Sequence, residues 1–255
     1  MTQNTESQPR TILITGASQG IGLAYAQAFA QSGANVVMAD IRGAEQAAAG
    51  LSSSSVIGVT GDVTDATQAQ AIVQSAIDRF GRLDILVNNA AFYAGLNLAN
   101  FEQISEADWD RSMNVNVKGV WLMCRAAAPQ MRSQGWGRII NVASNVVFMG
   151  KPNFLHYVTS KGAVWALTNA MSRELAGTGI TVNCVAPGYT ITPATREMGT
   201  PEQVAELERQ IIDAQSVKRL LEPEDMVGAV RYLASEDAAM VTGQTIIVDG
   251  GVIVG

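Results

Sequence analysis

The sequence has little of what metal sites, disulfide scaffolds and nucleic-acid surfaces require. Its 255 residues include one histidine and two cysteines, Cys124 and Cys184, which are far apart in the chain. We therefore expect neither a catalytic metal nor a disulfide framework, but a reduced, cytoplasmic protein. Charged residues make up 16% of the chain, the net charge is −6, and Lys and Arg do not cluster. No surface for nucleic acid or an anionic membrane is expected from this charge pattern.

Long apolar runs are also absent. No run approaches the roughly 20 residues that a membrane-spanning helix needs. Residues 1–10 are polar and lack the apolar stretch of a signal peptide, so we expect a flexible N-terminal tail.

The sequence is instead rich in hydrophobic residues, at 47%, and in glycine, with 24 residues. Short apolar segments predict strands at 11–15, 35–39, 56–60, 83–87, 138–142, 181–185 and 245–248. Amphipathic segments predict helices at about 21–31, 66–80, 106–133, 154–175, 201–214 and 223–234. The alternation predicts the α/β class: one Rossmann-type, doubly wound domain over 11–255, with a parallel sheet of about seven strands and helices on both faces. The cofactor half would cover about 11–145 and the catalytic and substrate half about 146–255, with a lid at about 189–215.

A glycine-rich turn, Gly16-Ala-Ser-Gln-Gly20-Ile-Gly22, follows the first predicted strand and opens the first helix. Gly16 and Gly20 allow a tight turn whose backbone N–H groups approach a pyrophosphate, and Gly22 lets the helix pack closely on the strand. Three glycines also occur in ordinary turns between a strand and a helix. The strand before this turn and the helix after it nevertheless favour a nucleotide-binding site. Ser18, Gln19 and Ile21 belong to the same turn.

Asp40 ends the second predicted strand. A carboxylate there accepts hydrogen bonds from the adenosine ribose hydroxyls and repels a 2′-phosphate. The alternative is a turn cap, a common role for Asp. Because neither Ser18 nor Gln19 is basic, the sequence favours NAD(H) over NADP(H), although Arg42 lies two positions further on.

Tyr157 and Lys161 are four residues apart, which places both side chains on one face of a helix. An ammonium beside the phenol favours the phenolate and makes proton exchange with an alcohol feasible. The pair alone also occurs by chance on amphipathic helices. Ser144 closes the fifth strand, where its hydroxyl would polarise a substrate oxygen or simply cap a turn. Asn116 and Asn114 are competing candidates within a predicted helix, and periodicity does not choose between them.

Together these residues resemble the short-chain dehydrogenase/reductase family, in its compact single-domain branch. The resemblance runs from residue 11 to about 251. Its marks are Thr15-Gly-Ala-Ser-Gln-Gly-Ile-Gly22, Asp62-Val63, Asn88-Asn-Ala90, Asn116, Ser144, Tyr157-Val-Thr-Ser-Lys161, Pro187-Gly188 and Val248-Asp-Gly-Gly251. Two positions depart from the family pattern, Ala91 for the usual glycine and Thr190 for the usual Ile or Val.

The resemblance implies a role for each catalytic residue. Tyr157 would be the general acid/base, Ser144 would bind the substrate carbonyl, and Lys161 would bind the nicotinamide ribose and tune Tyr157. Asn116 would anchor a proton-relay water, and it is preferred to Asn114 because it lies seven residues after Trp109. The implied cofactor-binding residues beyond the glycine turn and Asp40 are Ile41, Asp62, Val63, Asn89, Ala90, Tyr157, Lys161, Pro187, Gly188, Thr190 and Thr192.

The expected substrate pocket is mostly apolar or aromatic. Its candidate residues are Phe92, Tyr93, Ser144, Asn145, Val147, Phe148, Phe154, His156 and Tyr189. None is a cation placed to pair with a carboxylate, so an uncharged, fairly hydrophobic secondary alcohol or ketone is expected. Residues 135–157 also resemble family members that act on aryl or cyclic secondary alcohols. His156 is expected to pack or to line the wall rather than to transfer protons.

Other activities stay open at this point. A 3-oxoacyl-(acyl-carrier-protein) reductase or a sugar/polyol dehydrogenase is the main alternative, and a non-catalytic NAD-binding regulatory protein is a further one. Asp40 and the scarcity of basic residues disfavour the acyl-carrier-protein enzyme. The resemblance also implies a homotetramer, with a dimer as the alternative.

Overall fold

The computed structural model describes residues 8–254. Residues 1–7 of the predicted tail, and Gly255, lie outside the described residues. Arg10 is anchored to the body of the protein, because its guanidinium lies 3.6 Å from the Trp136 ring centroid and pairs with Glu236 at 2.6 Å.

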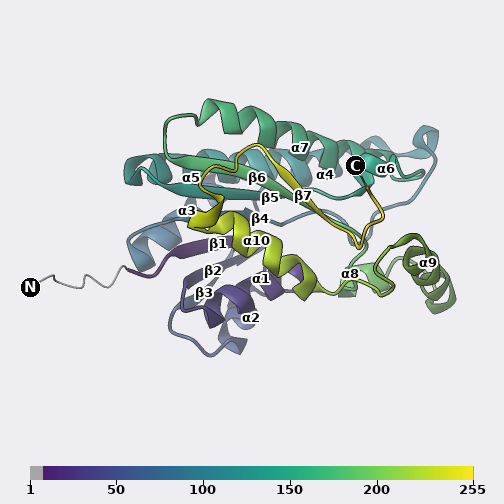
Figure 1. Ribbon diagram of the computed structural model, residues 1–255, viewed down its shortest axis with the longest axis horizontal. Helices are drawn as coiled ribbons and strands as arrows, with labels where there is room; N and C mark the ends of the chain where they lie inside the picture. The colour runs from purple at the N-terminus through teal and green to yellow at the C-terminus, as the bar shows by residue number, and fades with distance from the viewer. Residues whose placement is uncertain (1–7, 255) are drawn as a thin grey trace, which may run out of the picture.

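A single parallel sheet organises the chain (Figure 1). Its strands are β1 (Thr11–Thr15), β2 (Asn35–Asp40), β3 (Val56–Thr60), β4 (Ile85–Asn88), β5 (Gly137–Val142), β6 (Ile180–Pro187) and β7 (Thr245–Val248). They pair in the order β3-β2-β1-β4-β5-β6-β7, and every pairing is parallel. The predicted fold class is confirmed, and the predicted strand ends shift by only one or two residues.

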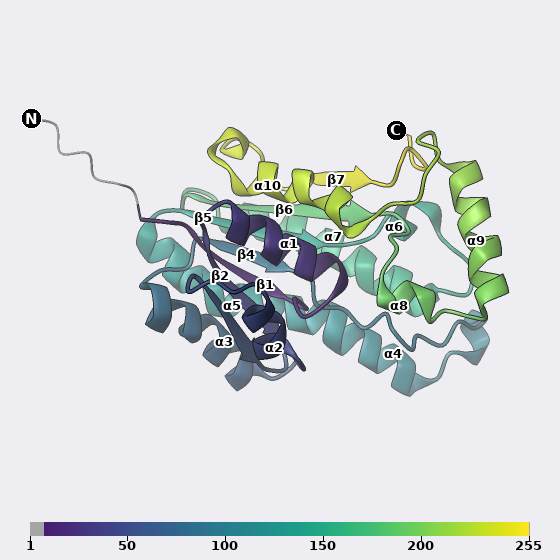
Figure 2. The same cartoon turned by 90° about the horizontal axis from the view of Figure 1, so that it is seen from below.

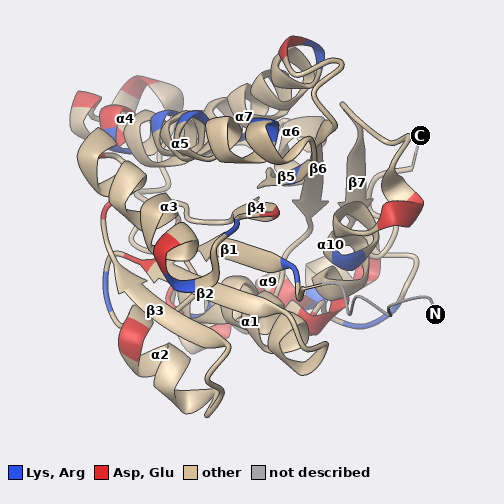
Figure 3. Ribbon diagram, turned by 90° about the vertical axis from the view of Figure 1, so that its left-hand side faces the viewer, with Lys and Arg blue, Asp and Glu red and all other residues tan. Residues whose placement is uncertain are grey.

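Helices cover both faces of the sheet, as the end-on view in Figure 3 shows. They are α1 (Gly20–Gln31), α2 (Ala44–Gly50), α3 (Ala66–Phe80), α4 (Glu106–Met113), α5 (Gly119–Gln134), α6 (Val146–Met149), α7 (Leu155–Glu174), α8 (Pro193–Arg196), α9 (Pro201–Ala214) and α10 (Val227–Ala234). Alternate strand residues belong to different cores: Leu13 packs with residues of α3, α5 and α7, whereas Ile12 and Ile14 pack with residues of α1 and α10. Two-sided burial explains why the strands are almost continuously apolar.

The long helix predicted at 106–133 is wrong as a single helix. A π-helical turn, Asn114–Lys118, separates α4 from α5. Beyond it, Gly119 packs so tightly that an added Cβ would lie 2.8 Å from Val63 Cγ2. Such turns insert an extra residue and rotate the faces on either side, and they are frequent at functional sites.

Three short helices, α2, α6 and α8, were not predicted, and the predicted helix at 223–234 begins as a 3₁₀ segment, Pro223–Met226. Neither α2 nor α6 has a side-chain cap, and both are too short for a periodic pattern. Gly43 precedes α2 with φ of 74°, a left-handed conformation that glycine adopts readily.

The strand order reverses between β1 and β4. From β1 the chain builds outward to β2 and β3, and from β4 it builds the other way to β7. In open α/β sheets, ligands bind at the carboxyl ends of the strands on either side of such a reversal. At this end of the sheet α6, α8 and α9 gather (Figure 2).

Candidate active site

One cavity of about 1250 Å³ lies at the carboxyl edge of the sheet. A single small ligand typically occupies about 300–1,000 Å³, so this cavity has room for a dinucleotide and a second molecule. The predicted cofactor residues that line it are Gly16, Ser18, Gln19, Gly20, Ile21, Asp40, Ile41, Asp62, Val63, Asn89, Ala90, Tyr157, Lys161, Pro187, Gly188, Thr190 and Thr192. Segments that are far apart in the sequence thus meet around one space.

The glycine turn has the close approaches that its sequence predicts. Gly16 and Gly20 have φ of 64° and 56°, and an added Cβ at Gly16 would lie 2.8 Å from Ala90 Cα. At Gly22 an added Cβ would lie 2.1 Å from the Gly16 carbonyl oxygen. Gly22 therefore packs the helix against the turn and, unlike the other predicted residues of the turn, does not line the cavity.

Asn89 ties this turn to the end of β4. Its amide nitrogen donates to the carbonyl oxygens of Thr15 and Gly16, each at 3.0 Å. The Thr15 hydroxyl in turn accepts from the backbone N–H of Asn89 at 3.1 Å and of Ala90 at 3.0 Å. The two strands that flank the reversal are held together at the cavity wall.

Asp40 lies against the same turn. Its Oδ2 accepts a hydrogen bond from the Ser18 N–H at 3.0 Å and another from the Ser18 hydroxyl at 2.6 Å. The carboxylate is thus oriented at the cavity edge, with Arg42 beside it in the lining.

Tyr157 is buried between two aromatic rings. The ring centroid of Tyr93 is 5.2 Å away in an edge-on arrangement, and that of Phe154 is 6.3 Å away. Burial raises the pKa of the Tyr157 phenol, Tyr93 adds to the rise, and hydrogen bonding to the Ser144 hydroxyl opposes it. In the protein alone, the phenol is therefore held protonated at neutral pH.

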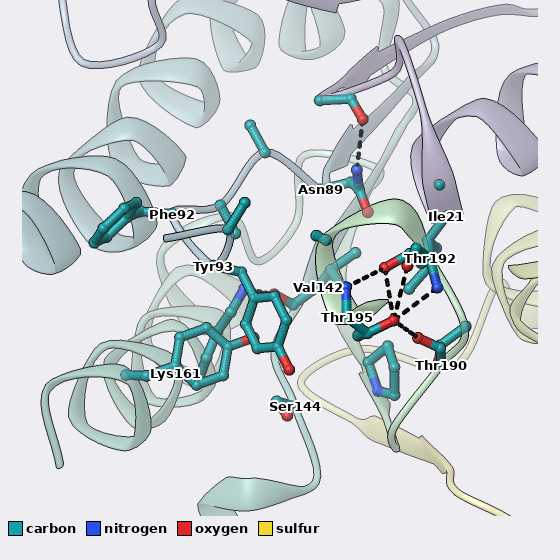
Figure 4. A pocket seen from close by; sticks show the side chains of 18 of the residues that line it. Ile21, Asn89, Phe92, Tyr93, Val142, Ser144, Lys161, Thr190, Thr192 and Thr195 are labelled. Carbon is teal, nitrogen blue, oxygen red and sulfur yellow. Dashed lines mark hydrogen bonds between the residues drawn. The ribbon is translucent and has the colours of Figure 1, made fainter. Parts of the chain in front are cut away.

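Lys161 lies one helical turn further along α7. Its Nζ donates to the Val142 carbonyl oxygen at 2.8 Å and is 5.7 Å from the Tyr157 ring centroid. Burial lowers the pKa of Lys161 to about 8. At neutral pH the ammonium form prevails, and it favours the phenolate of the neighbouring tyrosine. Figure 4 shows Lys161, Ser144 and Val142 on one side of the cavity.

Asn116 lies behind the cavity wall rather than in it. Its Oδ1 accepts from the Phe92 N–H at 2.6 Å, and its Nδ2 donates to the Ser160 hydroxyl at 2.9 Å. Ser160 in turn donates to the Tyr157 carbonyl oxygen at 2.8 Å. Asn116, in the π-helical turn, thus joins the Phe92 backbone to the Ser160 side chain of α7, whereas Asn114, its competitor, is exposed and lines the cavity. Of the four predicted catalytic residues, Ser144, Tyr157 and Lys161 line the cavity together.

The predicted substrate residues divide in two. Phe92, Tyr93, Asn145, Phe154 and Tyr189 line the cavity, whereas Val147, Phe148 and His156 do not. His156 is completely buried, because adjacent helical residues point about 100° apart and Tyr157 takes the cavity side. Phe148 lies on the outer side of α6 and is 42% exposed.

Sequence reasoning missed several lining residues. Thr195 is the centre of a small network (Figure 4): its hydroxyl lies 3.0 Å from the Thr190 carbonyl oxygen and accepts from the Thr192 N–H at 2.8 Å. The sequence Thr192-Pro-Ala-Thr195, a helix start, was a usable signal. Other unpredicted lining residues include Arg111, Met149, Lys151, Leu207, Ile211, Asp249 and Val252.

Two cations line the cavity in addition to the predicted pocket residues. They are Arg111 and Lys151, and neither was among the substrate candidates expected from the sequence. The sequence places them outside the recognised motifs, so only their position in the fold shows that they face this space.

The described part of the chain also bears on membranes and metals. No helix among residues 8–254 is long and apolar enough to cross a membrane. Within the same residues, no group of three or more His, Cys, Asp or Glu side chains is arranged to hold a metal ion.

The fold and the cavity define a Rossmann-type α/β protein, and known proteins narrow this class. A family model described as Enoyl-(Acyl carrier protein) reductase matches residues 16–253. The D-beta-hydroxybutyrate dehydrogenase of Rhizobium meliloti is 36% identical over 256 residues, which cover 95% of this chain and 98% of the relative. The (2S)-[(R)-hydroxy(phenyl)methyl]succinyl-CoA dehydrogenase subunit BbsD of Thauera aromatica is 39% identical over 250 residues, 96% of each chain.

A solved structure agrees in fold over nearly the whole chain. The crystal structure of the 3-ketoacyl-(acyl-carrier-protein) reductase from Brucella melitensis complexed with NADH has a TM-score of 0.87 at 35% identity, covering 96% of this chain and 98% of that one. This chain belongs to the short-chain dehydrogenase/reductase family of oxidoreductases.

Proposed function

We propose that this protein is an NAD(H)-dependent oxidoreductase that interconverts a secondary alcohol and a ketone, with Tyr157 as the general acid/base. The observation that carries the proposal is the convergence of Tyr157, Ser144 and Lys161 on the cavity that begins at the glycine turn. Three groups of this chemistry on one wall suit proton transfer to and from a substrate oxygen.

The residues present fit a dinucleotide. The glycine turn at the start of α1 would hold the pyrophosphate, because positive φ values and the absence of Cβ atoms leave the backbone open to it. Asp62 and Val63 would flank the adenine, and the Pro187–Thr192 segment would pass the nicotinamide. When bound, the nicotinamide supplies or accepts the hydride.

The protein's own groups would handle the proton. In the reducing direction, Ser144 donates a hydrogen bond to the carbonyl oxygen and Tyr157 donates the proton that makes it a hydroxyl. In the oxidising direction, Tyr157 recovers that proton, and Lys161 stabilises the phenolate. Asn116 would support this step from behind through Phe92 and Ser160, in addition to the relay water that the resemblance implies.

Segment 189–215 would act as a lid over the substrate. Tyr93 donates a hydrogen bond to Met198 Sδ at 2.8 Å, and Tyr189 donates one to Glu208 at 3.3 Å. Thr190, Thr195 and Gln215 of this segment are buried, whereas none of the α9 residues is, so α9 is the part that would move with few contacts broken.

Asp40 supports NAD(H) over NADP(H). Its carboxylate is fixed by Ser18 at the position where ribose hydroxyls would donate to it, and a 2′-phosphate would meet its charge. The NADH complex of the Brucella relative supports a nicotinamide cofactor in this family.

The walls favour a ring-bearing substrate. Tyr93, Phe154 and Tyr189 give flat apolar surfaces near Tyr157, which suit an aryl or cyclic alcohol. The name of the Thauera relative contains a hydroxy(phenyl)methyl group, which supports the same class. The contacts described above do not favour the two alternatives, an acyl-carrier-protein substrate or a polyol, over an aryl or cyclic alcohol.

Replacing Tyr157 by Phe tests this function. The substitution removes the proton donor but keeps the ring between Tyr93 and Phe154, so we expect a fall in kcat of at least about 10³-fold with unchanged NADH affinity. NADH oxidation with aryl and cyclic ketones measures kcat, and NADH fluorescence titration measures affinity. A variant that turns over like the wild type would refute the proposal.

A further inference from the structure

Lys151 lies between α6 and α7 and lines the cavity near the proposed proton donor. Its Nζ is 4.8 Å from the ring centroid of Phe154, and that ring is 6.3 Å from the Tyr157 ring centroid. The two distances put the ammonium within about 11 Å of the Tyr157 ring centroid. A substrate held at Tyr157 and Ser144 can therefore reach Lys151 with another of its groups.

The ammonium has no counter-charge. Among residues 8–254, no salt bridge and no hydrogen bond joins the Lys151 side chain to the protein. The side chain is half-buried, and burial lowers its pKa with no carboxylate to oppose the shift. A lysine of this reach usually extends its ammonium into water or pairs it with an acid. Lys151 has no acid partner among the described residues, and its Nζ keeps contact with solvent in the cavity, so a carboxylate of a bound molecule can take the place of that water.

The other cations of the cavity differ from Lys151 in their surroundings. Lys161 is held by the Val142 carbonyl oxygen, and Arg42 lies beside Asp40 at the other end. Arg111 is exposed and stacks on the Phe92 ring, with its Cζ 4.1 Å from the centroid. Lys151 is thus the cation best placed for a substrate group.

The number of cations near Phe154 limits the charge of the anion. Besides Phe154, the cavity lining includes the apolar Met149, Leu207, Ile211 and Val252, together with neutral polar side chains such as Asn145 and Gln210. One ammonium in an apolar and aromatic setting suits a carboxylate on a hydrocarbon frame, whereas a phosphate dianion needs several donors to replace its water.

We infer that Lys151 binds a carboxylate of the substrate, so that the enzyme acts on aryl or cyclic keto and hydroxy acids. The inference rests on the proposed function, and it replaces the uncharged substrate that the sequence led us to expect. The pair would also orient the ring-bearing chain, because it fixes a second point of the molecule besides the reacting oxygen.

Equilibrium binding tests the inference without turnover. The probes are 3-benzoylpropionate and 4-benzoylbutyrate, each with its ethyl ester, titrated by calorimetry into the enzyme with NAD⁺, a complex in which a ketone cannot be reduced. We expect at least one acid to bind about tenfold more tightly than its ester, the effect of one partly desolvated charge pair. This preference should vanish in Lys151→Met and persist in Lys151→Arg.

The control is Arg173→Met, which removes the same unit of charge at the exposed end of α7 and should leave the preference intact. Equal binding of acid and ester by the wild type, or an unchanged preference in Lys151→Met, would overturn the inference. NADH oxidation by the same compounds separates it from the proposed function. Turnover without an acid preference removes only the carboxylate subsite, whereas selective binding of the acids without any ketone reduction removes only the proposed reaction.

Discussion

Substituting Gly22 by Ala sets two physical effects against each other. Alanine in place of a helical glycine ordinarily stabilises a protein by about 0.5–1 kcal/mol. At Gly22, however, the new methyl would lie 2.1 Å from the Gly16 carbonyl oxygen and 2.6 Å from Asn89 Nδ2, closer than unbonded atoms approach. Because one obstruction is backbone, the turn itself must move.

The magnitude follows from comparing the two effects. Overpacking a tight site by one methyl costs about 1–3 kcal/mol, and a rigid backbone neighbour puts Gly22 near the top of that range. We expect a net loss of about 2 kcal/mol, which for a chain of this size lowers Tm by about 4–8 °C. In the displaced turn the backbone N–H groups no longer point toward the pyrophosphate, so the Kd for NADH should rise about tenfold or more.

Gly228 gives the matched control. It is also helical, in α10, but an added Cβ there meets nothing within 4 Å. Gly228→Ala should therefore raise Tm by about 1–4 °C and leave NADH affinity unchanged. Differential scanning calorimetry and NADH fluorescence titration measure both variants. A Gly22→Ala protein as stable as Gly228→Ala, with wild-type affinity, would refute the close packing of the turn.

Two further predictions concern charge. Wild-type kcat/KM should be much higher with NADH than with NADPH. Asp40→Ala should lower the ratio of the two kcat/KM values about tenfold or more, because it relieves repulsion of the 2′-phosphate. The same ratio in both proteins would contradict the role of Asp40. Lys161, with its pKa lowered from 10.5 to about 8, binds fewer protons when folded than when unfolded between these values, so its contribution to stability rises with pH across that window. Urea unfolding at pH 7 and pH 10 should show the wild type gaining on the order of 2 kcal/mol relative to Lys161→Met, and a constant difference would argue against a buried ammonium.

The sequence predicted most of the fold and the parts of the site that belong to one local segment. The glycine turn is readable because it joins a strand to a helix, and Tyr157 and Lys161 are readable because residues four apart share a helix face. The apolar strands indicated two-sided burial, and hence a parallel sheet with its ligand edge. The homotetramer that the resemblance implies stays a prediction.

Only the tertiary structure decided how separate segments meet. Asn116 turns toward Ser160 because a π-helical turn, invisible in the periodicity, rotates it away from the cavity. His156 is buried although its neighbour Tyr157 lines the cavity, since packing against other elements selects which side of α7 is covered. Lys151 lies against the Phe154 ring and lines a cavity whose other walls come from distant segments of the chain. Local spacing fixes which side chains share a face, but the environment of that face, and so its chemistry, comes from residues far away in the chain.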